Sequence, residues 1–408
     1  MTVARRRVAV TGIGVVSALG VGRERTWQGL VNGRCGIGGV TLFDTAGYRS
    51  RLAAEIEDFQ PARYCSPIEQ RRWSRSDQIA VLAAGEALED AGLGAGQLDP
   101  ERTGLILGAG TSDLLRNEEY YAEVRTKGVA RARPSRIVNF FSNTPVDIVG
   151  RRFGITGQRH CVVAACSSST IAIGYAADAI RRGAMDTALA GGADALCRLT
   201  FSGFNALRLM DIEPCRPFDA GRQGMSIGEA GAVLVLEDFD RARARGVAIY
   251  AELAGYGAAC EAYHPTSPEP DGSIIAATIR AALADAQLPV DSVDHINAHG
   301  TGTLHNDRAE ARAFHRVFGE RAKSLPVNAI KSMTGHCLGA SGAIEAAVLA
   351  LTIARGVIPP TINHHRDDPD CALDVVPNQA REVRVRCGLS TSLAFGGNDA
   401  ALVMQRVE

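Results

Sequence analysis

Four short segments of the chain carry residue types that could do chemistry, and the first surrounds Cys166. Residues 162–170 are typical of a buried strand that ends in small residues and leads into a helix directly after the cysteine. A thiol at the start of a helix meets the positive end of the helix dipole, which favours the thiolate. We therefore expect Cys166 to be a nucleophile; the alternative is a structural cysteine buried at a tight turn.

The second segment places His299 directly after a predicted strand over residues 293–297. Open α/β sheets bind their ligands at the carboxyl ends of strands, so this histidine is placed to face a substrate. Thr301 and Thr303 offer hydroxyls on one side of an extended stretch, which suits a polar, chain-like ligand. The alternative is an ordinary loop histidine.

The third segment combines Lys331 and His336 with a glycine-rich entry to a predicted buried helix that carries Glu345. We expect Glu345 to pair with Lys331, because a buried lysine without such a partner would be costly. Only Lys127, Lys323 and Lys331 are lysines among the 44 basic residues. A lysine in an apolar segment of so arginine-rich a chain indicates a need for a compact ammonium group.

The fourth segment, residues 392–399, places Phe395 before Gly396 and Gly397. Adjacent glycines allow the backbone to come close to a ligand, and Phe395 could act as a movable gate. One cysteine, two histidines and a lysine fit the joining of two thioesters. The cysteine holds an acyl group, the histidines assist loss of CO2 from a malonyl thioester, and the resulting enolate attacks the acyl-cysteine.

The elements that must position these residues follow an α/β pattern, because apolar runs alternate with alanine-rich segments of helical period. The alanine- and glycine-rich helices expose little polar surface, so we expect them to lie between sheets. The loop 261–272, with three prolines, marks a domain boundary or a long ordered loop. The predicted strands are 8–11, 103–107, 161–164, 187–190, 232–236, 293–297, 324–328 and 401–405, and the predicted helices include 76–91, 168–182, 274–286, 307–318 and 341–355.

Composition excludes several classes of protein. The chain has 408 residues, 46% hydrophobic and 22% charged, with a formal net charge of -1. Such a chain can bury a large core, and it has no overall field that would attract nucleic acid or an anionic membrane. The ten cysteines form no C-x-x-C pair and no zinc-type cluster, which favours a reducing cytoplasm. Residues 5–21 superficially resemble a signal peptide, but their glycines favour a buried first strand and a turn.

The chain resembles the beta-ketoacyl-acyl-carrier-protein synthase I/II family of ketosynthases over essentially its whole length. The matching segments, in order, are residues 10–17, 165–168, 297–303, 331–336 and 395–397. The resemblance implies an α/β thiolase fold with two similar halves in a five-layered αβαβα sandwich. The halves would be residues 1–250, with the cysteine, and residues 251–408, with the histidines and the lysine.

The resemblance also implies a role for each matching residue. Cys166 would be acylated, His299 and His336 would assist decarboxylation, and Lys331 with Glu345 would tune the site electrostatically. The N–H groups of Cys166 and Phe395 would form an oxyanion hole, and Phe395 would gate the site. Residues implied to contact the substrate are Thr301 and Thr303, on the phosphopantetheine arm, and Phe204 and Thr111, at the acyl pocket.

The implied partners are an acidic acyl carrier protein and a second ketosynthase-like chain. That chain would be an identical copy or a homologous chain-length-factor-like subunit, and the substrates would arrive on the phosphopantetheine of the carrier. No metal, no bound cofactor, no nucleic acid and no membrane partner is implied. The basic positions that would dock the carrier are Arg71, Arg72, Arg131, Arg133 and Arg208.

The sequence departs from the family at its C-terminal motif. Primary fatty-acid enzymes usually read Gly-Phe-Gly-Gly-Thr-Asn, whereas this chain reads Ala-Phe-Gly-Gly-Asn-Asp over residues 394–399. The segment 301–307 also resembles polyketide-type ketosynthases. These departures favour specialised polyketide or polyene-type elongation over the housekeeping step.

Three other activities compete with condensation. Thiolases share the Gly-His-x-Leu-Gly-Ala-Ser-Gly motif of residues 335–342, but they need a second cysteine in the C-terminal glycine-rich loop, and residues 394–398 contain none. Chain-length factors typically lack the active cysteine, which this chain has. An acyltransferase or decarboxylase subunit that does not condense stays open.

Overall fold

Two sets of five strands, with the same internal order, form the scaffold of the molecule. The computed structural model describes residues 5–408 apart from 95, 113, 135 and 137–140. In space the first set runs β6-β5-β7-β9-β1 and the second runs β12-β11-β15-β16-β10, so each set follows the order third, second, fourth, fifth, first. The first set comprises β1 (Val8–Ser17), β5 (Thr103–Gly108), β6 (Arg159–Val162), β7 (Thr187–Asp194) and β9 (Ala230–Asp238). The second comprises β10 (Ala251–Cys260), β11 (His295–Asn297), β12 (Val327–Asn328), β15 (Cys387–Ser392) and β16 (Asn398–Gln405).

The two sets also share their strand directions. In each, the second strand pairs in parallel with the third and the fourth, and the remaining pairs are antiparallel. Strands β1 and β10 join the sets by antiparallel pairing of Ala9 with Glu252 and of Val10 with Ala251. The structure therefore has the two similar halves that the resemblance implies.

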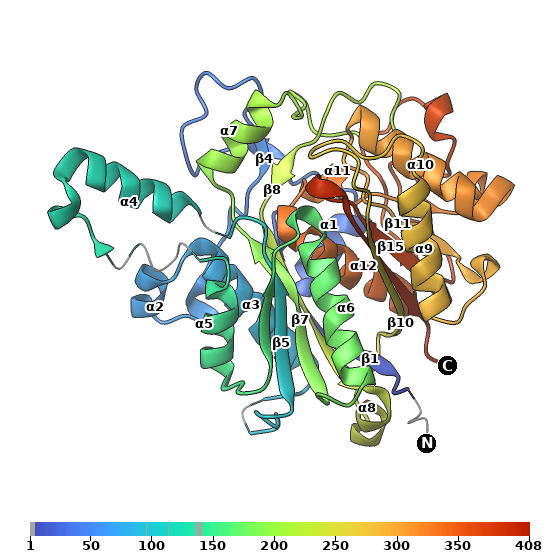
Figure 1. Cartoon of the computed structure of the whole chain (residues 1–408), viewed down its shortest axis with the longest axis horizontal. Helices are drawn as coiled ribbons and strands as arrows, with labels where there is room; N and C mark the ends of the chain where they lie inside the picture. Colours follow the sequence, from blue (N-terminus) through green and yellow to red (C-terminus); the bar gives the residue numbers. More distant parts are fainter. Residues whose placement is uncertain (1–4, 95, 113, 135, 137–140) are drawn as a thin grey trace.

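Helices cover both faces of each half-sheet and complete five layers (Figure 1). The inner layer is α6 (Ser168–Arg181) and α12 (Ser341–Arg355), which pack against each other and against strands of both halves. On the outer faces, α3 (Arg75–Asp90) and α5 (Thr144–Phe153) lie against the first half, and α9 (Ser273–Asp285), with α10 (Leu304–Phe318) beside it, lies against the second. This order confirms the predicted αβαβα sandwich.

Small residues let the inner helices approach their neighbours. A Cβ atom at Gly342 of α12 would lie 1.8 Å from Oγ1 of Thr170, and one at Gly174 of α6 would lie 2.4 Å from the ring of Tyr256. Among the described residues, one helical stretch, Leu338–Arg355, is long and apolar enough to cross a membrane, and 89% of it is buried inside the protein. Its composition is that of a core helix between two sheets, as the alanine- and glycine-rich pattern predicts.

Several boundaries differ from the sequence prediction. Strand β1 continues six residues beyond its predicted end, because Gly12 and Gly14 bring it against backbone carbonyls of Ala87 and Ala83 in α3. Strands β10 and β15 were not predicted. Their sequences, AELAGYGAAC and CGLSTS, contain too few large apolar residues to give a strand signal, and pairing on both sides defines them instead.

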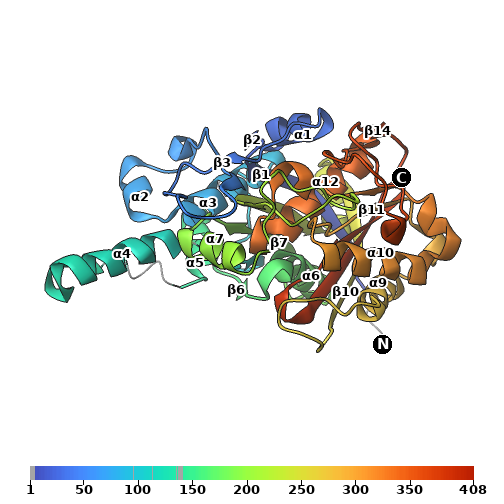
Figure 2. The same ribbon diagram turned by 90° about the horizontal axis from the view of Figure 1, so that it is seen from above.

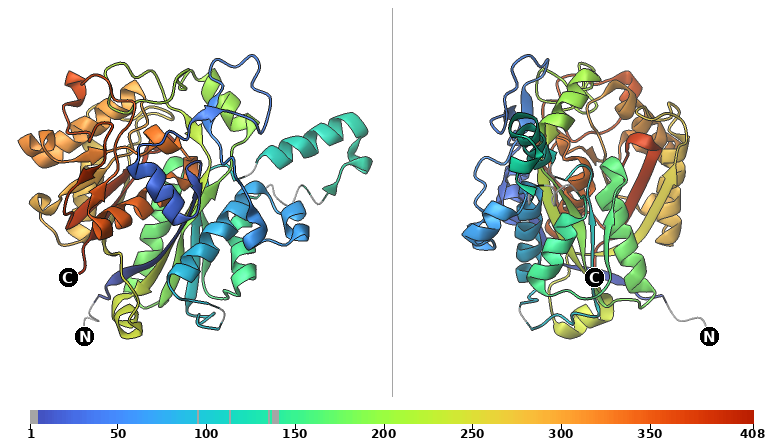
Figure 3. Two further views of the ribbon diagram at one scale, coloured as in Figure 1. Left: turned by 180° about the vertical axis from the view of Figure 1, so that it is seen from behind. Right: turned by 60° about the vertical axis from the view of Figure 1, so that its left-hand side comes forward.

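The remaining elements lie around this sandwich. Helix α4 (Leu114–Lys127) projects from the body as an arm (Figures 2 and 3), and α7 (Arg198–Ala206) lies at the opposite end of the sheet from α8 (Phe239–Arg245) (Figure 1). The other helices are α1 (Arg23–Val31), α2 (Pro67–Arg72) and α11 (Lys331–Thr334). The short strands are β2 (Gly20–Val21), β3 (Gly38–Gly39), β4 (Leu52–Ala54), β8 (Ile227–Gly228), β13 (Val357–Ile358) and β14 (Arg381–Glu382).

Candidate active site

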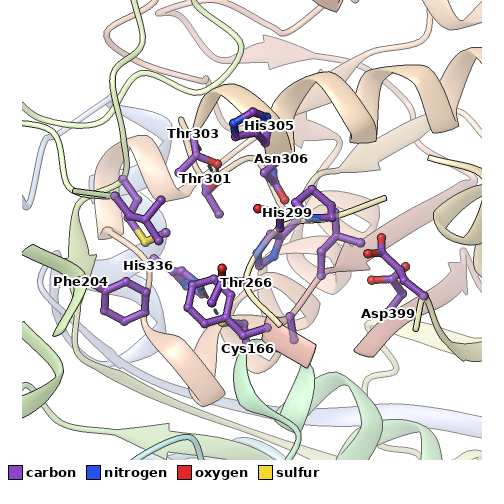
Figure 4. A pocket seen from close by; sticks show the side chains of 18 residues that line it. Cys166, Phe204, Thr266, His299, Thr301, Thr303, His305, Asn306, His336 and Asp399 are labelled. Carbon is purple, nitrogen blue, oxygen red and sulfur yellow. Dashed lines mark hydrogen bonds between the residues drawn. The ribbon is translucent and has the colours of Figure 1, made fainter. Parts of the chain in front are cut away.

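A cavity between the two halves collects the predicted chemical residues (Figure 4). It encloses about 650 Å³, part of it open to solvent, and Cys166, His299 and His336 line it. Cys166 comes from the first half, and the two histidines come from the second. Four sequence segments that lie far apart in the chain therefore meet at one site.

Cys166 lies in a tight 3₁₀ turn, η4 (Ala165–Ser167), between β6 and α6. Ala165 has φ of 49°, a left-handed conformation that is rare for alanine, and it turns the next side chain into the cavity. Burial raises the pKa of the Cys166 thiol to about 11, although Lys331 and the N–H of Phe395 both favour the thiolate. The helix position and Lys331 favour the thiolate, but desolvation outweighs them, so the resting group is the thiol.

His336 is the group placed to take the thiol proton. Its Nε2 lies 3.0 Å from Sγ of Cys166, and its Nδ1 lies 2.8 Å from Oγ of Ser341. Burial, with Lys331 adding to it, holds the pKa of His336 well below the usual range, so the ring is neutral. A serine hydroxyl can either donate or accept, so Ser341 allows the ring proton to sit on either nitrogen of His336.

His299 has a fixed tautomer, in contrast to His336. Its Nδ1 lies 3.2 Å from Nζ of Lys331, and an ammonium group can only donate, so the ring proton of this neutral histidine is on Nε2. Burial, followed by the charge of Lys331, lowers the pKa of His299 well below its usual range. The two imidazole rings meet edge to face with centroids 5.2 Å apart, so the cavity has two neutral histidines side by side.

Lys331 and Glu345 form an ion pair inside the protein core. Lys331, at the start of α11, is 1% exposed, and Nζ donates a short hydrogen bond to Oε1 of Glu345 on α12. Burial raises the pKa of Glu345 to about 7 even though Lys331 opposes the shift. The predicted pairing is therefore present, and through His299 it connects to the wall of the cavity.

We expect Lys331→Met to lower the free energy of unfolding by about 3–5 kcal/mol, because Glu345 is left as a buried acid without its counter-ion. Loss of Lys331 raises the pKa of Glu345 further, so the loss of stability grows as pH rises through neutrality and shrinks in acid. Urea unfolding at two pH values measures both effects. The double variant Lys331→Met/Glu345→Leu removes both charges and should recover most of the loss; an equally unstable double variant would contradict the explanation.

Phe395 opens a short turn, η9 (Phe395–Gly397), whose backbone also faces the thiol. The N–H of Phe395 donates to Sγ of Cys166. Gly396 and Gly397 have φ of 82° and 72°, values that favour glycine, and this conformation gives the turn its shape. The ring of Phe395 packs on that of Phe204, with centroids 5.6 Å apart.

Of the four residues predicted to contact the substrate, three line the cavity and one does not. Thr301 and Thr303 line the cavity with their hydroxyls 3.0 Å apart, and Phe204 of α7 lines it opposite them. Thr111 is not among the lining residues; its N–H donates to Asp194 and its hydroxyl is buried. The structure therefore does not bring Thr111 to this cavity.

Glu310, which no sequence motif singled out, holds the backbone of His299 in place. This buried residue of α10 accepts from the N–H of His299 at 2.7 Å, from the N–H of Gly300 at 2.8 Å and from the hydroxyl of Thr391 at 2.6 Å. A glutamate on the apolar side of the predicted helix 307–318 was the available signal. Its partners are 10, 11 and 81 residues away in the chain, so no local pattern identifies them.

The loop 261–272 is an ordered part of the cavity wall rather than a linker. It contributes Glu261, Thr266, Ser267 and Pro268 to the lining. Its carbonyl at Pro265 accepts from the N–H of Gly396 at 2.8 Å, which attaches it to the 395–397 turn. Of the two interpretations of this loop, the structure supports the long ordered loop.

The five arginines singled out as basic surface positions are all exposed. Two end α2, two lie after α4, and one follows α7; they are Arg71, Arg72, Arg131, Arg133 and Arg208. Arg208 has the clearest relation to the site, because Phe204 and Leu209 on either side of it line the cavity. It therefore lies at the rim of the cavity.

No cluster of three or more histidine, cysteine, aspartate or glutamate side chains that could hold a metal ion occurs in the part of the chain that the structure describes. All ten cysteines fall in that part, and each is a free thiol.

Two family models match successive parts of the chain. The model of the beta-ketoacyl synthase N-terminal domain matches residues 5–242, and that of the beta-ketoacyl synthase C-terminal domain matches residues 250–365. A putative polyketide beta-ketoacyl synthase 1 from Streptomyces halstedii is 42% identical over 98% of this chain and 98% of its own length. A 3-oxoacyl-acyl-carrier-protein synthase 2 from Synechocystis is 36% identical over 99% of both chains.

A solved structure of the ishigamide ketosynthase/chain length factor superposes with a TM-score of 0.95. It is 39% identical in sequence, and the superposition covers 99% of this chain and 100% of that one. The similarity therefore extends over the whole described scaffold, including both half-sheets.

Proposed function

Because the chain belongs to the beta-ketoacyl synthase family, we propose that it joins an acyl group held on Cys166 to the two-carbon unit of a malonyl thioester. The observation that carries this proposal is the meeting of Cys166 with two neutral histidines at one cavity, with the buried Lys331 directly behind His299. The reaction is a decarboxylative Claisen condensation, and the enzyme is an acyltransferase that forms a carbon–carbon bond.

The first step transfers the acyl group to the enzyme. His336 Nε2 takes the proton of the Cys166 thiol, and Sγ attacks the carbonyl carbon of the incoming thioester. The N–H groups of Cys166 and Phe395 hold the oxyanion of the tetrahedral intermediate. The carbon–sulfur bond to the carrier then breaks, and the departing thiolate takes the proton back from His336.

The second step forms the new bond. The malonyl thioester loses its carboxylate as CO2, and the electron pair of the broken bond becomes an enolate whose oxygen accepts from Nε2–H of His299 and of His336. The enolate carbon attacks the acyl carbonyl on Cys166, and the Cys166 thiolate leaves and takes a proton from solvent. The fixed Nε2–H of His299 and the switchable proton of His336 supply the two donors.

The substrate contacts follow from the wall of the cavity. Thr301 and Thr303 bind the phosphopantetheine arm, Phe204 bounds the acyl pocket, and Phe395 gates the passage between acylation and condensation. Thr111 lies off the wall, so we assign it a supporting position behind the pocket through its bond to Asp194. The nucleophile belongs to the half formed by residues 1–250, and the histidines and the lysine belong to the half formed by residues 251–408.

An elongation assay tests this function. The enzyme is mixed with malonyl-carrier protein and a panel of acyl thioesters, and the products are identified by mass. Formation of 3-oxoacyl thioesters two carbons longer than the starter supports condensation. Acyl transfer or CO2 release without a longer product would instead support the open alternative, a subunit that does not condense.

The partners that fit this function are an acyl carrier protein and a second ketosynthase-like chain, either an identical copy or a chain-length factor. A pairing surface is available where β6 forms the edge of the sheet and α4 projects with exposed Tyr121, followed by exposed Val129 in the next turn. We place the enzyme in the cytoplasm, without a resident cofactor. Its departures at residues 394–399 favour specialised polyketide or polyene-type elongation.

We expect Arg208→Glu to raise the KM for acyl carrier protein about 3- to 10-fold, since a repulsive charge replaces an attractive one at the rim. The value of kcat at saturating carrier should change little, because Arg208 does not touch the reacting atoms. The control is Arg243→Glu on α8, an exposed arginine at the other end of the molecule. An unchanged KM in Arg208→Glu would remove this arginine from the docking surface.

A further inference from the structure

Two acidic side chains on the cavity wall have no part in the steps above. Asp399, in β16, is 1% exposed, and Glu261 follows directly after the end of β10. Because β10 and β16 pair with Cys260 opposite Asn398, the two acids lie near one another, and their carboxyl groups are within hydrogen-bonding reach of each other. Both line the same cavity as Cys166.

A hydrogen bond between two carboxyl groups requires a proton on one of them. Glu261 Oε1 and Asp399 Oδ2 are both buried, and no N–H or hydroxyl of the described residues donates to either oxygen. The other oxygen of Glu261, Oε2, accepts from the N–H of Glu269 at 2.8 Å. The pair is therefore satisfied only when the two acids share a proton.

The surroundings supply negative charge rather than positive charge. The charge of Glu269 raises the pKa of Glu261, and the charge of Glu310 of α10 raises the pKa of Asp399. His299 shares the cavity wall but is held neutral, and neither acid forms an ion pair with a described lysine or arginine. Burial, then the charges of Glu261 and Glu310, raises the pKa of Asp399 to about 9, and burial also raises the pKa of Glu261.

The same two strand ends hold the turn that carries Phe395. The N–H of Glu261 donates to the carbonyl of Gly397 at 2.8 Å, and the N–H of Gly396 donates to the carbonyl of Pro265 at 2.8 Å. Asp399 follows that turn by two residues. The carboxyl pair is thus a third link between the 395–397 turn and the 261–272 loop.

We propose that Glu261 and Asp399 share one proton and that this proton fastens the 395–397 turn to the 261–272 loop, which makes Asp399 a positioning residue for Phe395. When both acids ionise, two dry carboxylates face each other, and their repulsion releases the turn. The role of Phe395 as a gate rests on the proposed function, whereas the shared proton and the fastening of the turn do not.

The first measurement tests the proton itself. Infrared spectra of the purified enzyme at about pH 8.5, where Glu345 with its pKa of about 7 is mostly ionised, should show the carbonyl stretch of a buried protonated carboxylic acid, and the difference between the wild type and Asp399→Asn should contain that band. The matched control is Asp271→Asn, an exposed acid of the same loop, which should leave the band unchanged. Absence of the band from the wild type, or its survival in both Asp399→Asn and Glu261→Gln, would overturn the proposal.

The second measurement tests the fastening. Hydrogen exchange of the Gly396 and Glu261 amides, corrected for the intrinsic rate, should show an alkaline step: protection falls about tenfold per pH unit from about pH 5 to about pH 9 and then levels off, because the fastened turn holds a proton that the released turn does not. Asp399→Asn keeps a donor for Glu261 but cannot ionise, so its protection should stay flat over this pH range. Glu261→Gln offers a second variant, in which Asp399 can ionise beside an amide donor, and it should also lose the alkaline step.

Protection that does not change with pH in the wild type, or the same alkaline step in Asp399→Asn, would overturn the proposal. Neither measurement needs turnover. An enzyme that shows the shared proton and the alkaline step but makes no longer product would contradict the proposed function alone. An enzyme that condenses but shows neither would contradict the proton link alone.

Discussion

Replacing Cys166 with alanine should abolish acyl loading, with no acyl adduct detectable by intact mass after incubation with acyl-carrier protein. The physical reason is that the attacking sulfur is removed and no other thiol lines the cavity among the described residues. Cys166 is a small side chain, 7% exposed, so alanine leaves little empty volume and the fold should persist. Circular dichroism and the Tm should therefore match those of the wild type within a few degrees.

The matched control for this substitution is Cys161→Ala. Cys161 lies on β6, five residues before the proposed nucleophile, and its thiol donates to the carbonyl of Ser142 rather than facing the cavity. Loading of Cys161→Ala should be normal. Acyl transfer onto Cys166→Ala would contradict the assignment of the nucleophile.

Replacing His336 with alanine should allow acyl loading but reduce elongation about 10²- to 10⁴-fold. Loading is slower but survives, because the Cys166 thiol can still lose its proton to solvent and the resulting thiolate is favoured by Lys331 and the N–H of Phe395. Condensation fails because the enolate oxygen loses one of its two Nε2–H donors. Quenched-flow loading and product formation, both read by mass, separate the two steps.

The loading step of His336→Ala should also depend on pH. The Cys166 thiol, whose pKa is raised to about 11, must then release its proton to solvent, so loading should accelerate as pH rises towards that value. His305→Ala is the control, since His305 lines the outer part of the same cavity without contacting Cys166 or His299 by a hydrogen bond in the described structure. Normal product formation by His336→Ala would refute the two-histidine mechanism.

The sequence predicted those site residues whose reactive group and neighbouring structural elements lie in the same short segment of the chain. Cys166 at a strand-to-helix turn, His299 after a strand and Lys331 with Glu345 are of this kind, and the structure brings all four into contact or onto one cavity wall. The helices 168–182 and 341–355 were predicted almost to the residue, because their small and apolar residues mark buried helices between sheets.

The sequence could not predict features that depend on pairing across the fold. The thiol of Cys166 is protonated because of desolvation by both halves, which no local helix dipole reveals. Glu310 and Ser341 matter through contacts with the backbone of His299 and the ring of His336, and strands β10 and β15 are defined by their neighbours. Thr111 was aligned to the pocket by motif alone, and the turn after β5 directs it towards Asp194 instead.

The most direct test of the account is a single turnover of enzyme already acylated on Cys166. The acyl-enzyme is separated from free thioester and mixed with malonyl-carrier protein, and the adduct, CO2 and 3-oxoacyl-carrier protein are followed together by mass and gas release. Condensation on Cys166 predicts that the adduct disappears with the same rate constant with which CO2 and the 3-oxoacyl product appear, in equal amounts. Release of CO2 while the acyl group stays on Cys166 would contradict it.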